Sequence, residues 1–156
     1  MFEASVTLSC SECGKEFQKK KSFLTKQEAS DFVKKETKRR KKLCATCYKK
    51  LKTAQYVQEA QEGNYPDIQG KSEKQVELAV YLRGQYMEHN KGKMERAMRE
   101  LSRISLAKLP EICRQYQMTE LQLLEKLYTP KGLYEAMVIL LCYDASTIID
   151  TLIKKR

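Results

Sequence analysis

Two Cys-x-x-Cys pairs lie in the first third of this chain, Cys10 with Cys13 and Cys44 with Cys47. Two cysteines spaced in this way can direct their thiolates at one metal ion, and two such pairs complete a tetrahedral four-sulfur site. Thirty residues separate Cys13 from Cys44, so the segment between the pairs must contain structure of its own. The spacing therefore predicts one structural Zn²⁺ ion per chain, bound by all four cysteines.

Two other interpretations of these cysteines are unrelated thiols and a pair of redox motifs. A redox Cys-x-x-Cys is expected singly beside a βαβ pattern, which this sequence does not show. The remaining cysteines, Cys113 and Cys142, lie among apolar residues and are predicted to be buried and unreactive. No basic stretch followed by an apolar run opens the chain, so we expect a cytoplasmic protein with reduced thiols.

Residues 1–60 are predicted to form a small α+β module around the metal. Apolar residues alternate with polar ones before Cys10, which predicts a strand, and residues 16–22 are expected to return as the second strand of a hairpin. Gly14, directly after Cys13, suits the left-handed backbone that turns amide groups toward sulfur. A capping box from Thr25 to Glu28 predicts a helix start, and another helix is expected to begin at the second cysteine pair.

Residues 61–71 are rich in turn-forming residues and are predicted to be a linker. Residues 72–156 show helical periodicity and no strand pattern, which predicts an all-α bundle of about five helices. A capping box is expected at Ser72, a short helix at Pro110, a further capped helix at Thr119 and a longer helix from Thr129. The expected fold is thus mainly α, with a small N-terminal α+β zinc-binding module and a C-terminal all-α helical bundle.

The formal net charge of +10 is concentrated in the N-terminal module. Residues 1–53 hold 15 Lys and Arg against 6 Asp and Glu, whereas residues 54–156 hold 15 against 14. The stretch from Lys34 to Lys42 is too charged to bury and is expected to be exposed. Concentrated positive charge attracts phosphates or acidic proteins, although lysine-rich faces are often only solvated. The predicted contact residues for such a partner are Lys34, Lys35, Lys38, Arg39, Arg40, Lys41, Lys42, Lys49 and Lys50.

The cysteine pairs, with a Gly after the first pair and a predicted helix at the second, resemble the zinc-ribbon and treble-clef class of small four-cysteine zinc fingers. The resemblance covers about residues 5–60 and implies metal-ligand roles for the four N-terminal cysteines. Members of this class bind DNA, RNA or proteins, so the resemblance implies the metal and leaves the partner open. A short segment, residues 70–76, is similar to a helix-opening segment of uncharacterised bacterial and phage-type proteins.

Other patterns give weaker signals. Residues 109–128 have a helix-turn-helix rhythm, but the second helix carries a net negative charge, which favours ordinary helical packing over DNA reading. His89 is the only histidine and is expected to be a surface residue at a helix end. No phosphate loop, metalloprotease motif or catalytic triad is present, so we expect no enzyme activity and no small-molecule substrate. No apolar run is long enough to span a bilayer, and no membrane partner is expected.

The function that these observations favour is a non-enzymatic zinc-binding protein associated with nucleic acid, DNA or RNA, through its basic module. The alternative is a protein–protein interaction module whose basic face meets an acidic protein surface. Such a module could be an adaptor, or an inhibitor of a host nucleic-acid enzyme encoded by a phage or mobile element.

Overall fold

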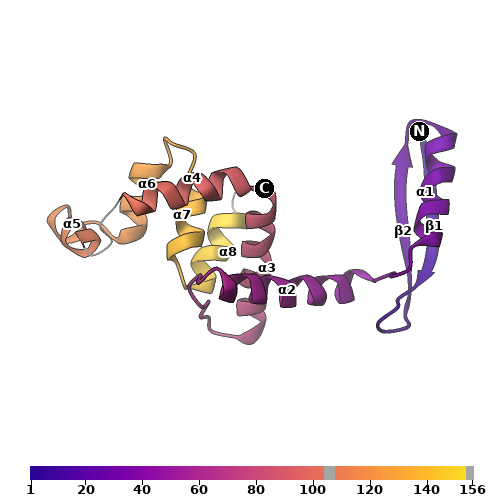
Figure 1. The fold of residues 1–156 in the computed structure, drawn as a ribbon, viewed down its shortest axis with the longest axis horizontal. Coiled ribbons are helices and arrows are strands. Elements are labelled where there is room, and N and C mark those ends of the chain that lie inside the picture. Colours follow the sequence, from indigo (N-terminus) through magenta and orange to yellow (C-terminus); the bar gives the residue numbers. More distant parts are fainter. Residues whose placement is uncertain (104–107, 154–156) are drawn as a thin grey trace. The chain divides into compact units, whose positions relative to one another are not determined.

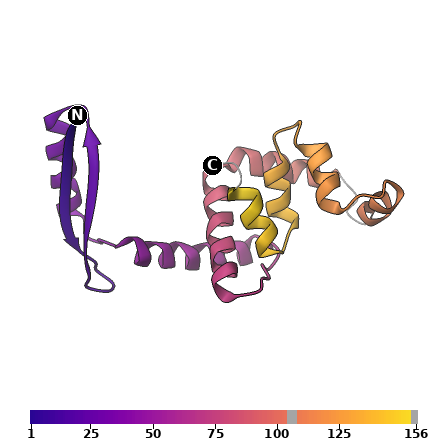
Figure 2. The same cartoon turned by 180° about the vertical axis from the view of Figure 1, so that it is seen from behind.

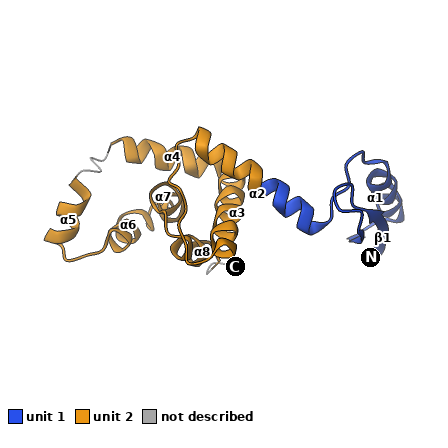
Figure 3. Ribbon diagram, turned by 90° about the horizontal axis from the view of Figure 1, so that it is seen from below, with its two compact units in different colours: residues 1–52 blue, residues 53–156 orange. Residues whose placement is uncertain are grey.

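The computed structural model describes residues 1–103 and 108–153, and the chain divides into two compact units, residues 1–52 and 53–156 (Figure 3). The division falls inside a helix, α2 (Ala45–Glu62), whereas the linker predicted from the sequence lies at residues 61–71. The predicted division into a metal-binding module (residues 1–60), a linker (61–71) and a helical bundle (72–156) remains a prediction. Residues 104–107 and 154–156 of the predicted bundle lie outside the described residues.

The first unit is built on an antiparallel hairpin of β1 (Phe2–Ser9) and β2 (Glu16–Phe23) (Figure 1). Leu8 is paired with Phe17 and Ala4 with Lys21, and the alternate residues Ala4 and Leu8 are buried. A strand exposes side chains on both faces in turn, so these residues define one covered face. Helix α1 (Lys26–Lys38) covers it, and the rings of Phe23 and Phe32 lie 5.3 Å apart.

The beginning of α1 confirms the capping box predicted from the sequence. The hydroxyl of Thr25 accepts from the backbone N–H of Glu28, and the Glu28 carboxylate accepts from the Thr25 N–H. The end of α1 differs from expectation, because Glu36 is buried within the stretch that was expected to be exposed. Its carboxylate is neutralised by Lys19 of β2 at 2.7 Å and by Arg39 at 3.2 Å. A buried carboxylate is stable where such partners replace the lost water.

In the described part of the second unit, all the regular elements are helices. After the C-terminal part of α2 come α3 (Glu73–His89), α4 (Lys91–Ser102), α5 (Leu109–Gln115), α6 (Glu120–Tyr128), α7 (Tyr134–Leu141) and α8 (Ala145–Ile153). Helices α3 and α8 lie side by side, and α7 packs against α4, α6 and α8 (Figure 1 and Figure 2). The fold class is therefore confirmed, with six helices from residue 72 onward among the described residues rather than about five.

The core of the second unit lies between α3, α4, α6, α7 and α8. Its completely buried residues include Ala79, Ala97, Met137, Ile139 and Ile148. Close packing of small and large apolar side chains is the main source of stability in such a unit.

Two helix starts differ from their predictions. The expected helix from Thr129 begins only at Tyr134, because Gly132 has a φ of +65° that interrupts any helix. Ser72 caps α3 as predicted, but the Gln75 side chain accepts from the N–H of Lys71 instead of closing the box. The short helix at Pro110 and the capping box at Thr119 are confirmed.

The segment between α2 and α3 is held against the helical core. Gln69 donates from its backbone N–H to the carbonyl of Tyr143 at 2.7 Å and accepts from Ala145 at 2.8 Å. The guanidinium of Arg83, which is only 4% exposed, donates to the carbonyl of Pro66 at 2.6 Å. Burial lowers the pKa of Arg83, and this carbonyl replaces part of the lost hydration.

Candidate metal centre

The four N-terminal cysteines converge in the first unit. Their sulfur atoms all lie within 4.8 Å of one another. Cys13 Sγ and Cys44 Sγ, one from each pair, are 3.8 Å apart. A tetrahedral site with metal–sulfur bonds of about 2.3 Å requires sulfurs about 3.8 Å apart, whereas a disulfide requires about 2.05 Å. The donor set and its spacing could therefore hold a metal ion.

The first pair lies in the turn between the two strands. Gly14 has a φ of +70°, which confirms the left-handed conformation expected after Cys13. Its N–H donates to the carbonyl of Cys10 at 2.9 Å, and the N–H of Cys10 donates to the carbonyl of Lys15 at 2.9 Å. These hydrogen bonds close a tight loop that carries both cysteines, with Cys10 buried and Cys13 exposed.

The second pair is brought to the first by backbone hydrogen bonds across the site. The N–H of Ser11 donates to the carbonyl of Lys42 at 2.7 Å, and the N–H of Lys42 donates to the Ser11 hydroxyl at 3.0 Å. The N–H of Cys44 also points at Cys10 Sγ, at 3.4 Å. Helix α2 then begins at Ala45, so its positive dipole end lies at the sulfur cluster, where it favours thiolates.

Cys10 and Cys47 have pKa values shifted in opposite directions. The backbone N–H groups of Cys44 and Cys13 stabilise the Cys10 thiolate and lower its pKa to about 6. Hydrogen bonds to Cys13 and Cys44 hold the proton on Cys47 and raise its pKa to about 12. A cation entering this cluster therefore meets a Cys10 thiol that already ionises near neutral pH and must displace the proton of Cys47.

The predicted basic contact residues lie on three segments of the first unit. Lys34, Lys35 and Lys38 lie on α1, residues 39–42 connect α1 to the second cysteine pair, and Lys49 and Lys50 lie on α2. Most are exposed, whereas Lys42 and Lys49 are half-buried. Arg39 is paired with Glu36, and Lys41 is paired with Glu12.

A hollow of about 590 Å³ lies beside the cysteine cluster, and the sequence did not indicate it. Its apolar wall includes Phe17 of β2 with Tyr48 and Leu51 of α2, the last two being 47% and 50% exposed. Lys19, Arg39 and Lys41 are among the polar residues that line it. The only available signal was the presence of apolar residues flanking the second cysteine pair.

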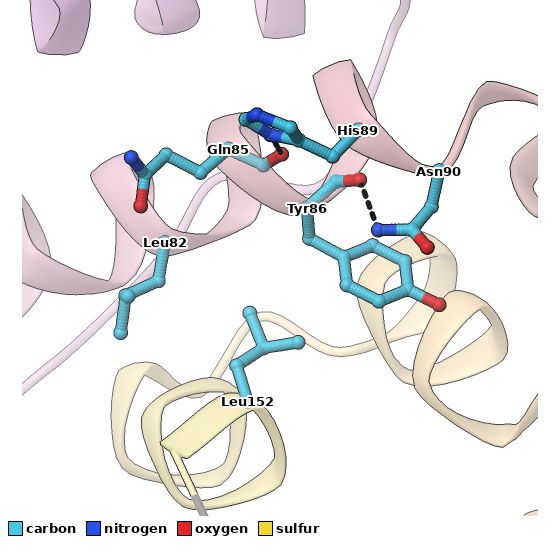
Figure 4. A pocket seen from close by; sticks show the side chains of 6 residues that line it. All are labelled: Leu82, Gln85, Tyr86, His89, Asn90 and Leu152. Atoms are coloured by element: carbon cyan, nitrogen blue, oxygen red, sulfur yellow. Dashed lines mark hydrogen bonds between the residues drawn. The ribbon is translucent and has the colours of Figure 1, made fainter. Parts of the chain in front are cut away.

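The residues with weaker signals are placed as follows. His89 ends α3, and its Nδ1 lies 2.7 Å from the carbonyl of Gln85, one turn earlier. It lines a hollow of about 400 Å³ with Tyr86 and Leu152 (Figure 4).

Cys113 is buried as predicted, but Cys142 is only half-buried because α7 ends at Leu141. In α6, the second helix of the helix-turn-helix rhythm, Leu123, Leu124 and Tyr128 are buried.

Among the described residues, no helix is both long enough and apolar enough to cross a membrane. No protein-family model matches the chain, and comparisons with curated proteins and with solved structures give no match either.

Proposed function

We propose that this protein is a non-enzymatic zinc-binding protein whose basic N-terminal unit associates with nucleic acid. The observation that carries the proposal is the convergence of four cysteine sulfurs within 4.8 Å of one another in the unit that carries most of the net positive charge. The proposed site is that of a four-cysteine zinc finger of the zinc-ribbon or treble-clef type.

Zinc fits this site better than Mg²⁺ or Ca²⁺ do. Four thiolates in a closed tetrahedron are the donor set of structural zinc sites, whereas Mg²⁺ and Ca²⁺ prefer oxygen ligands. A closed site leaves no open position for a substrate or a reactive water, which favours a structural role. The ion would link the β1–β2 turn to the start of α2, and it would fold residues for which the apolar core is small.

The positive charge of the first unit favours nucleic acid, with its negatively charged phosphates, as the partner. The first unit carries a surplus of nine positive charges before thiolates and metal are considered, with 15 Lys and Arg against 6 Asp and Glu in residues 1–53. Folding on zinc would fix these side chains on one scaffold, so several phosphates could be neutralised at once. We expect a cytoplasmic protein, because four metal-bound thiolates require a reducing compartment.

The test measures binding of a fluorescent duplex and a single strand over a range of salt concentrations. The variant replaces Lys34, Lys35, Lys38 and Arg40 with Gln, since all four are exposed and form no ion pair with the described residues. We expect the log–log salt slope of the wild type to be about −0.9 per phosphate neutralised on a duplex, and the variant to lose about one unit per contact. Zinc content should not change. Binding with an unchanged salt slope in this variant would refute the proposed contact through the N-terminal unit.

The alternative is a protein-interaction module, and the hollow next to the cysteines favours it. Phe17, Leu43, Tyr48 and Leu51 form an apolar wall lined by cations, which suits an acidic segment with apolar anchors. Affinity capture from the native host with and without nuclease separates the two functions. A single protein retained after nuclease treatment, and lost in a Tyr48→Ala/Leu51→Ala variant, would favour the alternative.

A further inference from the structure

Helix α4 of the second unit presents Arg96 and Arg99 on one face, and Arg103, its C-cap residue, follows on the same face. Arg96, Arg99 and Arg103 are spaced by three and four residues, so they fall within a narrow arc of the helix surface. The opposite face of α4 carries Met94 and Ala97, which are buried in the core. The arginines are therefore fixed on the solvent side of a helix whose orientation is set by packing.

This face borders a hollow of about 470 Å³, which we name the arginine hollow. Its other wall comes from the connection between α6 and α7, and Leu133 there is buried. The lining consists of Arg96, Arg99, Glu100, Arg103, Pro130, Lys131 and Leu133. It thus holds four cations and one carboxylate, from two segments of the chain.

The single carboxylate does not neutralise the hollow. Glu100 lies 2.9 Å from Lys131 Nζ and 3.5 Å from the guanidinium of Arg103, so one negative charge is shared by two cations. In the part of the chain that the structure describes, Arg96 and Arg99 are in no ion pair. Like charges one turn apart on a helix repel each other, and a bound anion would relieve this repulsion.

The composition of the unit does not account for the cluster. Residues 54–153 carry 12 Lys and Arg against 14 Asp and Glu, so the helical unit is slightly acidic over this range. A third of its cations nonetheless line one hollow with a single acid. Charge of one sign lining a concave surface raises the local concentration of counter-ions more than the same charge on a flat surface.

We propose that the arginine hollow is a phosphate-binding site. The guanidinium group presents a planar fork of donors that matches two phosphate oxygens, and three such groups on one helix face can surround a phosphate from one side. Lys131, fixed by Glu100 at 2.9 Å, supplies a positive charge from the opposite wall. The phosphate is either a phosphodiester of a nucleic acid, which would give this protein a second contact besides its N-terminal unit, or a small phosphate compound. The first source rests on the proposed function, whereas the site itself does not.

Two probes distinguish the sources in the full-length protein. Pyrophosphate, followed through the Nε–Hε resonances of the arginines, reports on the site alone. A fluorescent oligonucleotide, followed over a range of salt concentrations, reports on the polynucleotide contact. The variants are Arg96→Gln/Arg99→Gln, an Arg96→Lys/Arg99→Lys/Arg103→Lys triple that keeps the charge, and a Lys71→Gln/Lys74→Gln/Arg114→Gln control on other exposed positions.

We expect pyrophosphate to shift the resonances of Arg96, Arg99 and Arg103, and the lysine triple to weaken its binding by roughly tenfold or more. For the oligonucleotide, the double Gln variant should reduce the salt slope by about one to two units, and the control by less. Arginine shifts with pyrophosphate but no effect on oligonucleotide binding would assign the hollow to a small phosphate compound, whatever becomes of the proposed function. Absence of arginine shifts, or equal effects of the lysine triple and the control, would refute the site.

Discussion

Lys19 Nζ lies 2.7 Å from Oε2 of Glu36, so an ion pair joins strand β2 to helix α1 across the face that α1 covers. The Glu36 side chain is only 6% exposed, whereas that of Lys19 is 33% exposed. The hydrogen bond from Lys19 lowers the pKa of Glu36 below its ordinary value of 4.5, and burial opposes this shift. The hairpin and the helix are therefore joined by a charge interaction as well as by apolar contact.

Replacing Glu36 with Gln should lower the free energy of unfolding by about 1–3 kcal/mol, because a buried charged hydrogen bond is lost. A lowered folded-state pKa stabilises the fold above the unfolded-state pKa, and this contribution disappears as the pH falls through the folded-state value. The difference in free energy of unfolding between wild type and variant should thus be constant from about pH 8 to pH 6. It should become smaller only below about pH 4.5. Denaturant unfolding measures it. The exposed Glu16→Gln is the control, and a loss of similar size in that variant would contradict the argument.

The elements of the first unit could be predicted because their signals are local. The alternation before Cys10, the capping residue Thr25 and the Gly after Cys13 each act within a few residues, and the structure confirms all three. Burial of Glu36 could not be predicted, because its partner Lys19 lies 17 positions away along the chain.

The same distinction applies to the sites. Convergence of the cysteine pairs followed from metal-ligand spacing, but the Ser11–Lys42 hydrogen bonds that bring them together are contacts between residues distant in sequence. The arginine hollow was missed because composition averages over a nearly neutral unit, and its second wall comes from Lys131, far from α4 in the sequence. The only local sequence signal for the arginine hollow was the helical spacing of Arg96, Arg99 and Arg103.

Purified protein should contain about one zinc per chain, and Cys44→Ser should lose most of it, because three thiolates leave the tetrahedron open. Acidification should release the metal, since protons compete with it for each thiolate. Elemental analysis and a colorimetric zinc indicator measure both effects. Cys113→Ser removes a buried cysteine of the other unit and should keep the metal. Full zinc content in Cys44→Ser would contradict the four-thiolate site.

The Tyr86 hydroxyl is buried and has no hydrogen-bond partner among the described residues. Loss of hydration, together with the charge of Glu135, raises its pKa to about 12. Tyr86→Phe removes a polar group that gains nothing from the fold, so the free energy of unfolding should stay the same or rise by about 1 kcal/mol. Tyr81→Phe is the matched control on α3, because the Tyr81 hydroxyl accepts from Gln85 at 3.0 Å, and its loss should destabilise. Greater destabilisation by Tyr86→Phe than by Tyr81→Phe would show that the hydroxyl has a partner.

The last prediction concerns Gly84 of α3, which lies directly against the ring of Tyr56 on α2. A Cβ at position 84 would overlap the ring, and Tyr56 cannot turn away freely, because its hydroxyl donates to Glu88 at 2.5 Å. Gly84→Ala should therefore lower the free energy of unfolding by about 1–3 kcal/mol, since overpacking outweighs the better helix propensity of Ala. Gly92→Ala, in α4 with nothing within 4 Å of its Cβ, should instead stabilise by about 0.5–1 kcal/mol. Thermal and denaturant unfolding of both variants measure the contrast, and a Tyr56→Ala background should remove most of the Gly84→Ala penalty. Equal effects of the two alanines would mean that the close approach of Tyr56 to α3 does not exist in solution.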